Sequence, residues 1–254
     1  MALYQSLPPQ RPLAVLSDVD DTVAPSTQPV SDAMAAAMVA LADSGTKLVF
    51  VSGGSVAQMT KQVSAKLPRA HHLLGTSGSH AVAVDAAGKQ MELFKVGFSE
   101  TERQEILAAL DALVKHFHIL PDTNREDQVQ DRGCQFTLSA LGRGAADARK
   151  RAFDADGSLR REWVRFLVAR LGDDRFTMRV GGTTSVDITA KGVDKATGVH
   201  RLLDTLGWKA ENGLYFGDRF EETGNDHPVL QVMDCVNVHG PDQTLQHFLA
   251  LLKR

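Results

Sequence analysis

Three carboxylates lie close together near the N-terminus, in the stretch LSDVDDTVAP that spans residues 16–25. Asp18, Asp20 and Asp21 directly follow the apolar run at residues 13–16. Such a short run is typical of a parallel strand buried on both faces, and open parallel sheets bind ligands beyond the carboxyl ends of their strands. Because crowded carboxylates repel one another, we expect a compensating cation here, and hard oxygen ligands favour Mg²⁺.

The spacing of the first two carboxylates allows a specific chemistry on phosphorus. A carboxylate held against a metal ion can attack a phosphoryl group and form an aspartyl-phosphate. Asp20 follows Asp18 by two residues, so in an extended chain it points to the same side and can protonate a leaving oxygen or deprotonate an attacking one. Taken alone, the pair is better explained by an aspartate-rich surface turn. The rest of the chain therefore decides between the two interpretations.

A second predicted strand ends in residues that suit a phosphate. The apolar residues 47–51 are followed by Ser52, Gly53 and Gly54, just before a predicted helix. A hydroxyl group and free backbone amides at the start of a helix can hold a phosphate. This stretch therefore complements a nucleophilic carboxylate.

The later part of the chain adds more carboxylates and two lysines. The predicted strand at residues 214–216 ends next to Asp218, and Asp226 follows shortly after. The sequence KGVDK supplies Lys191 and Lys195, and lysines at this kind of site neutralise phosphoryl oxygens. Together these residues favour a phosphoryl-transfer site over a surface turn.

The ordered stretches DVDDT, VSGGS, KGVDK and GDRFEETGND resemble the four motifs of the haloacid dehalogenase superfamily of phosphotransferases. The resemblance implies that Asp18 is the nucleophile and Asp20 the general acid/base, while Asp21 stands where many relatives have glycine and receives no role. It implies Mg²⁺ as the cofactor. The implied catalytic residues are Asp18, Asp20, Ser52, Lys191 and Lys195; Gly53 and Gly54 bind substrate; and Asp18, Asp20 (through its carbonyl), Asp218 and Asp226 hold the metal.

The order of predicted elements indicates an α/β fold with an insertion. Strands and helices alternate over the first ninety residues and again after residue 195, which predicts a parallel sheet. The middle instead predicts antiparallel strands with one polar face and two helices. We expect a Rossmann-like parallel-sheet haloacid dehalogenase core of residues 1–85 and 189–254, and an inserted α+β cap domain of residues 86–188.

The insertion resembles a particular branch of the superfamily. It lies between the second and the lysine motif, as in the second cap type, and it carries Arg132, Arg143 and the GG-x-x-S-x-D stretch with Ser185 and Asp187. These residues resemble the cap of eukaryotic-type phosphomannomutases. Two arginine forks suit bidentate contacts to a distal phosphate, and Ser185 and Asp187 suit phosphate and sugar hydroxyls.

Some alternatives stay open at this point. The third cap arginine of that family is matched by either Arg149 or Arg151, and the KG-x-x-K form with Lys191 is commoner in capped sugar phosphatases. The leading interpretation is an Mg-dependent phosphohexomutase that interconverts hexose 1-phosphate and hexose 6-phosphate through an aspartyl-phosphate. A sugar-phosphate phosphatase of the same fold is the alternative. A non-catalytic Mg²⁺ or phosphosugar-binding module is disfavoured, because every catalytic position is filled.

The composition of the chain argues against some classes of binding partner. The net charge of −3 gives no basic excess for nucleic acid or an anionic membrane surface. No stretch approaches the ~18 apolar residues of a membrane span. The two cysteines are far apart in the sequence, which favours a reducing compartment. We therefore expect a cytoplasmic enzyme with a hexose phosphate substrate and no nucleic-acid or membrane partner. Analogy with related mutases suggests a homodimer.

Overall fold

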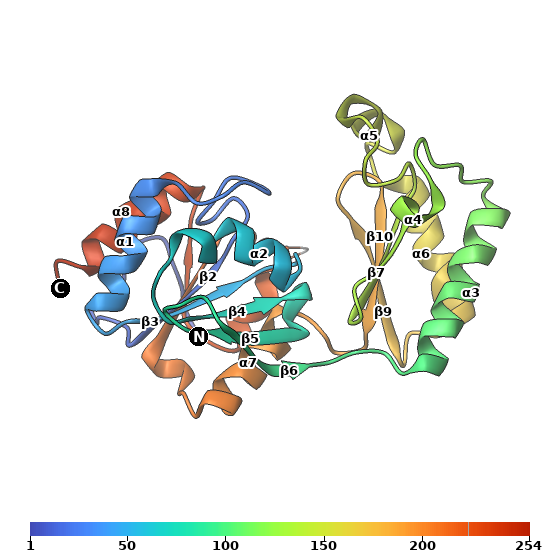
Figure 1. Ribbon diagram of the computed structural model, residues 1–254. Helices are drawn as coiled ribbons and strands as arrows, with labels where there is room; N and C mark the ends of the chain where they lie inside the picture. Colours follow the sequence, from blue (N-terminus) through green and yellow to red (C-terminus); the bar gives the residue numbers. More distant parts are fainter. Residues whose placement is uncertain (223) are drawn as a thin grey trace. The chain divides into compact units, whose positions relative to one another are not determined.

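The computed structural model describes residues 1–222 and 224–254; Thr223, which belongs to the GDRFEETGND stretch, lies outside them. The chain divides into two compact units, residues 1–95 with 194–254, and residues 96–193 (Figure 1). The first boundary lies ten residues beyond the expected position, because residues 90–95 form a strand of the first unit's sheet. No helix among the described residues is long and apolar enough to cross a bilayer.

The first unit is built on an eight-stranded sheet with the order β1-β12-β11-β2-β3-β4-β5-β6. The strands from β1 to β4 in this order pair in parallel, and β5 and β6 extend the sheet as antiparallel strands. The strands are β1 (Leu3–Tyr4), β2 (Ala14–Asp18), β3 (Lys47–Val51), β4 (His71–Gly75), β5 (His80–Val84), β6 (Gln90–Lys95), β11 (Gly213–Gly217) and β12 (Cys235–Asn237).

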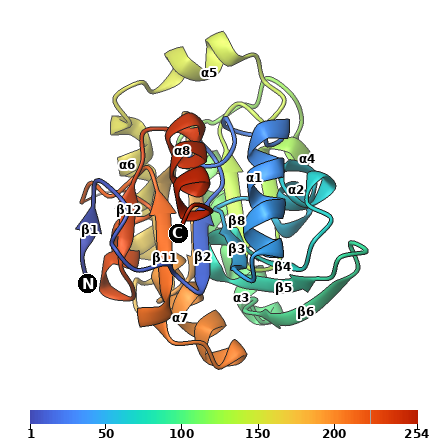
Figure 2. The ribbon, with the colours of Figure 1, turned by 90° about the vertical axis from the view of Figure 1, so that its left-hand side faces the viewer.

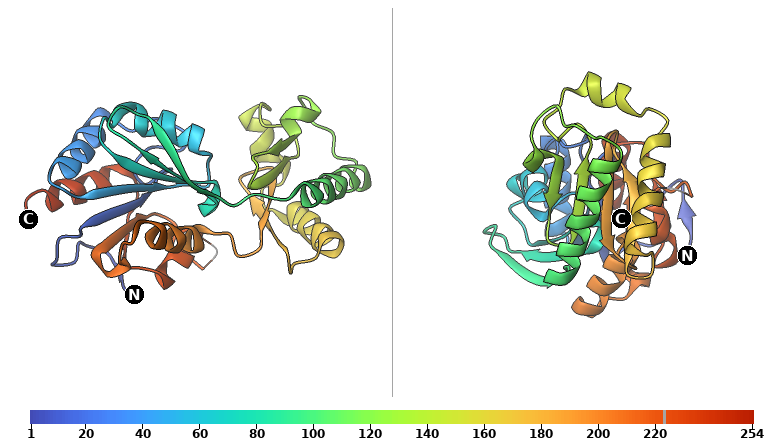
Figure 3. Two further views of the ribbon diagram at one scale, coloured as in Figure 1. Left: turned by 60° about the horizontal axis from the view of Figure 1, so that its bottom comes forward. Right: turned by 90° about the vertical axis from the view of Figure 1, so that its right-hand side faces the viewer.

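Helices cover both faces of this sheet. Along β2, Val15 packs with α1, α2 and α8, whereas the next residue, Leu16, packs with α7, as the two-residue period of a strand requires. Figure 2 shows α1 and α8 side by side on their face, and the left view of Figure 3 shows α7 on the opposite one. The helices are α1 (Asp32–Asp43), α2 (Val56–Gln62), α7 (Lys195–Leu206) and α8 (Pro241–Leu251), with short 3₁₀ turns η1 (Ser64–Lys66), η2 (Thr76–Gly78), η3 (Ala210–Asn212) and η4 (His227–Gln231).

The second unit is a four-stranded antiparallel sheet with the order β7-β8-β10-β9. Helices α3 and α6 pack on one face, where Trp163 is fully buried. The opposite positions of β8 and β10 are polar, as expected of a sheet with one apolar face. The elements are α3 (Glu100–His116), α4 (Arg125–Gln128), β7 (Val129–Asp131), β8 (Gln135–Ser139), α5 (Asp147–Phe153), α6 (Ser158–Leu171), β9 (Phe176–Gly181) and β10 (Ser185–Ala190).

Candidate active site

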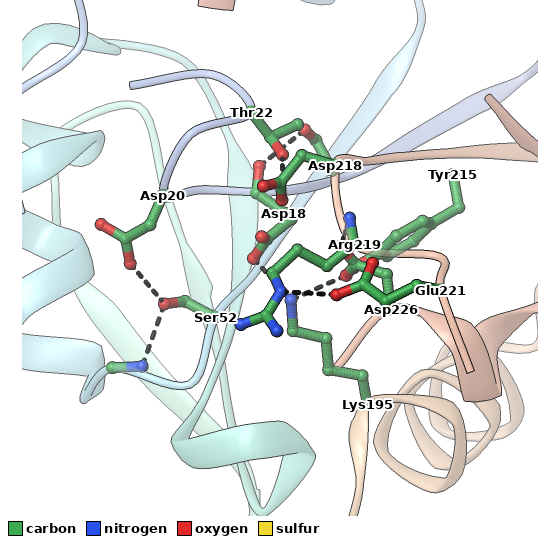
Figure 4. Close-up of polar contacts among 12 residues, drawn as sticks. Asp18, Asp20, Thr22, Ser52, Lys195, Tyr215, Asp218, Arg219, Glu221 and Asp226 are labelled. Carbon is green, nitrogen blue, oxygen red and sulfur yellow. Dashed lines mark hydrogen bonds and ion pairs between the residues drawn. The ribbon is translucent and has the colours of Figure 1, made fainter. Parts of the chain in front are cut away.

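Three neighbouring strands of the first unit bring the predicted residues to one edge of the sheet. In the parallel order β11-β2-β3, Asp18 is the last residue of β2, Ser52 follows β3, and Asp218 follows β11. The carboxyl ends of parallel strands lie at the same edge. Figure 4 shows these side chains together with those of Lys195 and Asp226.

Lys195 is buried between two carboxylates. Its Nζ lies 2.6 Å from Asp18 Oδ1 and 2.8 Å from Asp226 Oδ1. The three side chains are 1%, 6% and 0% exposed, respectively. An ion pair in such a dry environment is much stronger than one on the surface, and each member depends on the others for its charged state.

Burial and the neighbouring charges shift the pKa values of Asp18 and Lys195. Loss of solvent, together with the charge of Asp226, raises the pKa of Asp18 to about 8, although Lys195 pulls it down. Burial alone would lower the pKa of Lys195, but the attraction of Asp18 and Asp226 outweighs it and raises that pKa. Lys195 therefore stays a cation, whereas burial opposes the ionisation of Asp18.

Asp226 is held by three donors. Its Oδ1 accepts a hydrogen bond from the Tyr215 hydroxyl at 2.6 Å as well as from Lys195, and its Oδ2 accepts one from the Arg219 amide at 3.1 Å. A Cβ atom on Gly217 would lie only 2.6 Å from Asp226 Oδ2, so glycine is required there. These contacts fix the carboxylate beside Lys195. The sequence did not predict Tyr215; it faces the same side of its strand as the buried residues that pack against α7.

Three neighbouring carboxylates form a site that suits a divalent cation. Oxygens of Asp18, Asp218 and Asp226 all lie within 4.8 Å of one another. Asp218 is half-buried and accepts a hydrogen bond from Thr22 Oγ1 at 3.2 Å, and its pKa is raised by burial and by the charge of Asp226. Several carboxylates with too little positive charge around them form a suitable donor set for a hard cation. We call Asp18, Asp218 and Asp226 the carboxylate cluster.

The side chain of Asp20 faces away from this cluster. Its Oδ1 accepts hydrogen bonds from the Thr27 amide at 2.7 Å and from Gln62 Nε2 at 3.0 Å, while its Oδ2 lies 3.5 Å from Ser52 Oγ. The metal role predicted for Asp20 concerns its carbonyl oxygen and stays a prediction. The next residue, Asp21, has φ +57°, a conformation that glycine adopts most easily and aspartate tolerates.

The loop after β3 leads directly into α2. Ser52 Oγ accepts a hydrogen bond from the Gly54 amide at 2.9 Å, and Ser55 Oγ caps α2 by accepting from the Gln58 amide at 3.2 Å. Gly53 and Gly54 are half-buried. Their predicted contact with substrate remains a prediction, but Ser52 lies beside Asp20, as a catalytic role would need.

The predicted sugar-binding residues of the second unit lie on the polar face of its sheet. Asp187 Oδ1 accepts a hydrogen bond from Thr137 Oγ1 at 2.6 Å, and Ser185 Oγ lies 3.2 Å from Ser139 Oγ on the neighbouring strand. A Cβ atom on Gly181 would lie 2.5 Å from Asp187 Oδ2, which explains the glycine in the GG-x-x-S-x-D stretch. We call Thr137, Ser139, Ser185 and Asp187 the polar sheet face.

The arginines of the second unit differ in their partners. Arg132 is half-buried, and burial lowers its pKa; the charge of Asp187 opposes this shift, and that of Arg143 adds to it. The exposed Arg143 guanidinium makes no hydrogen bond to another described residue. Arg149 forms a two-pronged pair with Asp122, with both contacts at 3.1 Å. Its guanidinium is thus already engaged by a carboxylate.

Lys191 and Asp18 belong to different units of the chain. Lys191 belongs to the second unit, where its side chain is exposed and its backbone amide donates to the Arg175 carbonyl at 2.7 Å. Lys195, four residues later, is the lysine that lies against the carboxylate cluster. The catalytic role predicted for Lys191 stays a prediction.

Solved structures of other proteins share the fold of this chain. The chain is similar to the IMP-bound, N-terminally truncated IMP-nucleotidase of Plasmodium falciparum, with a TM-score of 0.67 and 13% identity over 95% of this chain and 68% of that one. It is also similar to a haloacid dehalogenase-like hydrolase from Bacteroides thetaiotaomicron, with a TM-score of 0.63 and 14% identity over 94% and 98% of the two chains. The predicted fold, that of the haloacid dehalogenase superfamily, is confirmed.

Sequence comparison identifies the family of the chain. Residues 43–254 match the family described as eukaryotic phosphomannomutase, and the chain belongs to this family. It is 25% identical to a phosphomannomutase of Encephalitozoon cuniculi over 94% of this chain and 93% of that protein. It is 28% identical to a probable phosphomannomutase of Caenorhabditis elegans over 51% of each chain. The predicted class, a phosphotransferase of this superfamily, is therefore confirmed.

Proposed function

We propose that the protein is an Mg²⁺-dependent phosphohexomutase that interconverts hexose 1-phosphate and hexose 6-phosphate through a phosphoryl group on Asp18. The observation that carries this proposal is the buried contact of Asp18 with Lys195 inside the carboxylate cluster, in a chain of the phosphomannomutase family. A carboxylate fixed at a strand end, beside a cation, is well placed to attack phosphorus.

The first half of the reaction uses the residues of the first unit. An oxygen of Asp18 attacks the phosphorus atom, while Lys195 balances the charge of the phosphoryl oxygens. Asp20 gives a proton to the sugar oxygen that leaves. In the other half, Asp20 takes a proton from the free hydroxyl of a hexose monophosphate, that oxygen attacks the phosphoryl group on Asp18, and the bond from Asp18 to phosphorus breaks to give a hexose bisphosphate. After the bisphosphate reorients, its other phosphate returns to Asp18 by the first half of the reaction.

Asp18, Asp218, Asp226 and the Asp20 carbonyl are the residues that we propose to hold Mg²⁺. The ion supplies charge neutralisation at the phosphoryl oxygens when it is bound. Hard carboxylate ligands in small number favour Mg²⁺ over softer metals. Asp226 already accepts three hydrogen bonds, so it contributes mainly by fixing Lys195 and adding negative charge.

A mutase has to recognise a second phosphate, and the second unit offers residues for it. Arg132 and Arg143 are the forks that we propose to bind a distal phosphate, with Ser185 and Asp187 binding phosphate and sugar hydroxyls. Because Arg149 is paired with Asp122, Arg151 is the better candidate for a third arginine. A homodimer and a cytoplasmic location stay predictions.

Phosphorus NMR tests the proposal. The protein is incubated with Mg²⁺, mannose 1-phosphate or glucose 1-phosphate, and a trace of the corresponding 1,6-bisphosphate. A growing 6-phosphate signal without inorganic phosphate supports the mutase, and excess EDTA should abolish it. Inorganic phosphate as the main product would instead identify a sugar-phosphate phosphatase, the function favoured by the KG-x-x-K form of the lysine motif.

A further inference from the structure

Gln62, at the end of α2, is a buried polar residue to which the motifs give no role. We propose that Gln62 is a positioning residue for Asp20: it holds one carboxylate oxygen and thereby leaves the other as the oxygen that carries the proton. This inference rests on the proposed function, in which Asp20 is the general acid/base. All the residues that carry this inference belong to the first unit.

The orientation of the Gln62 amide is fixed by its surroundings. The residue is only 2% exposed. Its Nε2 donates to Asp20 Oδ1 at 3.0 Å and to the Gln28 carbonyl at 3.3 Å, and its Oε1 has no hydrogen-bond partner among the described residues. Turning the amide over would place Oε1 against two acceptors, a carboxylate and a carbonyl. The donor side of Gln62 therefore faces Asp20.

This arrangement is not the best one for stability alone. A buried acceptor without a partner costs on the order of 1–3 kcal/mol. An apolar side chain of the same length would avoid that cost, but it would leave Asp20 Oδ1 with one donor fewer. The gain lies in the placement of Asp20, which is the chemistry that the site requires.

The two oxygens of Asp20 have different surroundings as a result. Oδ1 accepts hydrogen bonds from both Gln62 Nε2 and the Thr27 amide, at 3.0 Å and 2.7 Å. An oxygen that faces two donors is a poor place for a proton. Among the described residues, the hydrogen-bond partner of Oδ2 is the Ser52 hydroxyl, at 3.5 Å, so Oδ2 is the oxygen left to pass a proton to the leaving group.

Gln62 also holds the loop that follows Asp20. Its backbone carbonyl accepts a hydrogen bond from the Val30 amide at 2.9 Å, in addition to the side-chain contact with the Gln28 carbonyl. The backbone contact does not depend on the side chain. A side-chain substitution therefore keeps one attachment of the loop and removes the donor to Asp20.

The proton from Asp20 matters only for some leaving groups. In the first step a bond forms between an Asp18 oxygen and phosphorus, the ester P–O bond breaks, its electron pair goes to the leaving oxygen, and the proton of Asp20 Oδ2 goes to that oxygen. A sugar oxygen is a poor leaving group and needs this proton. 4-Nitrophenolate leaves readily without it. An effect that passes through Asp20 must therefore depend on the leaving group.

The test is the rate of phosphoenzyme formation in a single turnover, measured by rapid acid quench with Mg²⁺ present. Gln62→Met keeps the length of the side chain but cannot donate. We expect the rate with hexose 1,6-bisphosphate to fall about 10- to 100-fold, the value of one hydrogen bond to a charged group. The rate with 4-nitrophenyl phosphate should fall less than about threefold, because no proton is needed. Both rates come from the same folded molecules, so their ratio is independent of the folded fraction.

Two further variants sharpen the result. Gln62→Glu keeps the shape of the side chain but turns the donor into an acceptor, and it should selectively slow the reaction with hexose 1,6-bisphosphate as well. Lys61→Met, at an exposed position one residue earlier in α2, should leave both rates unchanged. Equal slowing of both substrates in the Gln62 variants would mean a purely structural role, and wild-type rates would mean none; either result overturns the inference alone. A wild type that forms no phosphoenzyme from either ester overturns the proposed function and the inference with it.

Discussion

The carboxylate cluster of the first unit and the polar sheet face of the second both gather groups that suit phosphate and sugar, but their charges are balanced differently. In the first unit, Lys195 is buried against Asp18 and Asp226, and each charge has a partner inside the protein. In the second, the Arg143 guanidinium has no hydrogen bond to another described residue, and Arg132 has Gln130 as a neutral partner at 3.0 Å.

This difference indicates a division of labour. Buried, mutually paired charges are held rigidly, which suits the atoms that form and break bonds. A guanidinium group without a hydrogen-bonded carboxylate, such as that of Arg143, keeps its hydrogen-bonding capacity for an anion that arrives from outside. Substitutions in the two units should therefore affect different quantities.

Replacing the nucleophile should have the largest effect. Asp18→Asn should lower phosphoryl transfer by on the order of 10⁴-fold or more, because no step can begin without it. The free energy of unfolding of this variant should fall by no more than about 1 kcal/mol. The substitution removes one of three mutually repelling carboxylates, and Lys195 keeps its ion pair with Asp226. Turnover assays and urea unfolding measure the two quantities. Residual activity within tenfold of the wild type would exclude Asp18 as the nucleophile.

Removing the buried cation should affect stability most. Lys195→Met leaves Asp18 and Asp226 buried without compensation, so the free energy of unfolding should fall by about 3–5 kcal/mol. Arg143→Met, in the second unit, should change it by less than about 0.5 kcal/mol. Urea unfolding followed by circular dichroism measures both. Equal losses in the two variants would contradict the difference between the two regions.

Substitution of an arginine in the second unit should weaken the binding of substrate. Arg143→Met should raise KM for hexose 1-phosphate about 10- to 100-fold with a smaller change in kcat, since a charge-assisted contact to the distal phosphate is lost. Arg149→Met is the matched control: Arg149 is already paired with Asp122, and KM should change by less than about threefold. If Arg149→Met raised KM more than Arg143→Met, the roles assigned to these arginines would be reversed.

The pH dependence of stability should be the smallest effect. Burial alone would raise the pKa of Asp154, but hydrogen bonds from the Arg160 side chain and backbone and the Leu159 amide lower it below its usual value of 3.8. A lowered carboxyl pKa contributes stability that is fully present above that usual value and is lost as pH falls through the lowered one. Thermal unfolding between pH 6 and pH 2 measures this. The slope below about pH 4 should be shallower in Asp154→Asn than in the wild type; identical slopes would exclude this contribution.

The sequence predicted regular elements well where local signals are strong. Ser31 caps helix α1 and the chain turns at Gly45 with φ +89°, and serine before a helix and glycine after it are strong local signals. Strand β3 has the expected bounds. The helix predicted after Gly54 is short and ends at Gln62, and the chain continues from there as a 3₁₀ turn.

Other elements carry weak local signals. The strands β4, β5 and β6 were not predicted, because β4 begins with two histidines and β6 is an edge strand with no buried residue. These strands are fixed by their pairing with β3 and with each other. Pairing between strands cannot be read from the local sequence. For the same reason, the expected boundary of the first unit was residue 85, whereas the structure has it at residue 95.

The same distinction applies to the site. The motifs identified Asp18, Lys195, Asp218 and Asp226, which the fold brings together. They did not identify Tyr215 or Gln62, because such residues act through contacts that only the folded chain creates. Gln62 lies 42 positions from Asp20, and nothing in either local sequence indicates that contact.

The most direct test of the account is to find where the phosphoryl group is carried. The protein is incubated with Mg²⁺ and a hexose 1,6-bisphosphate, quenched in acid, reduced with borohydride and digested, and the peptides are analysed by mass spectrometry. The account predicts a hydroxylamine-sensitive phosphoenzyme and a peptide in which Asp18 has been reduced to homoserine. A phosphoryl group on any other residue, or none in a turning-over enzyme, would contradict it.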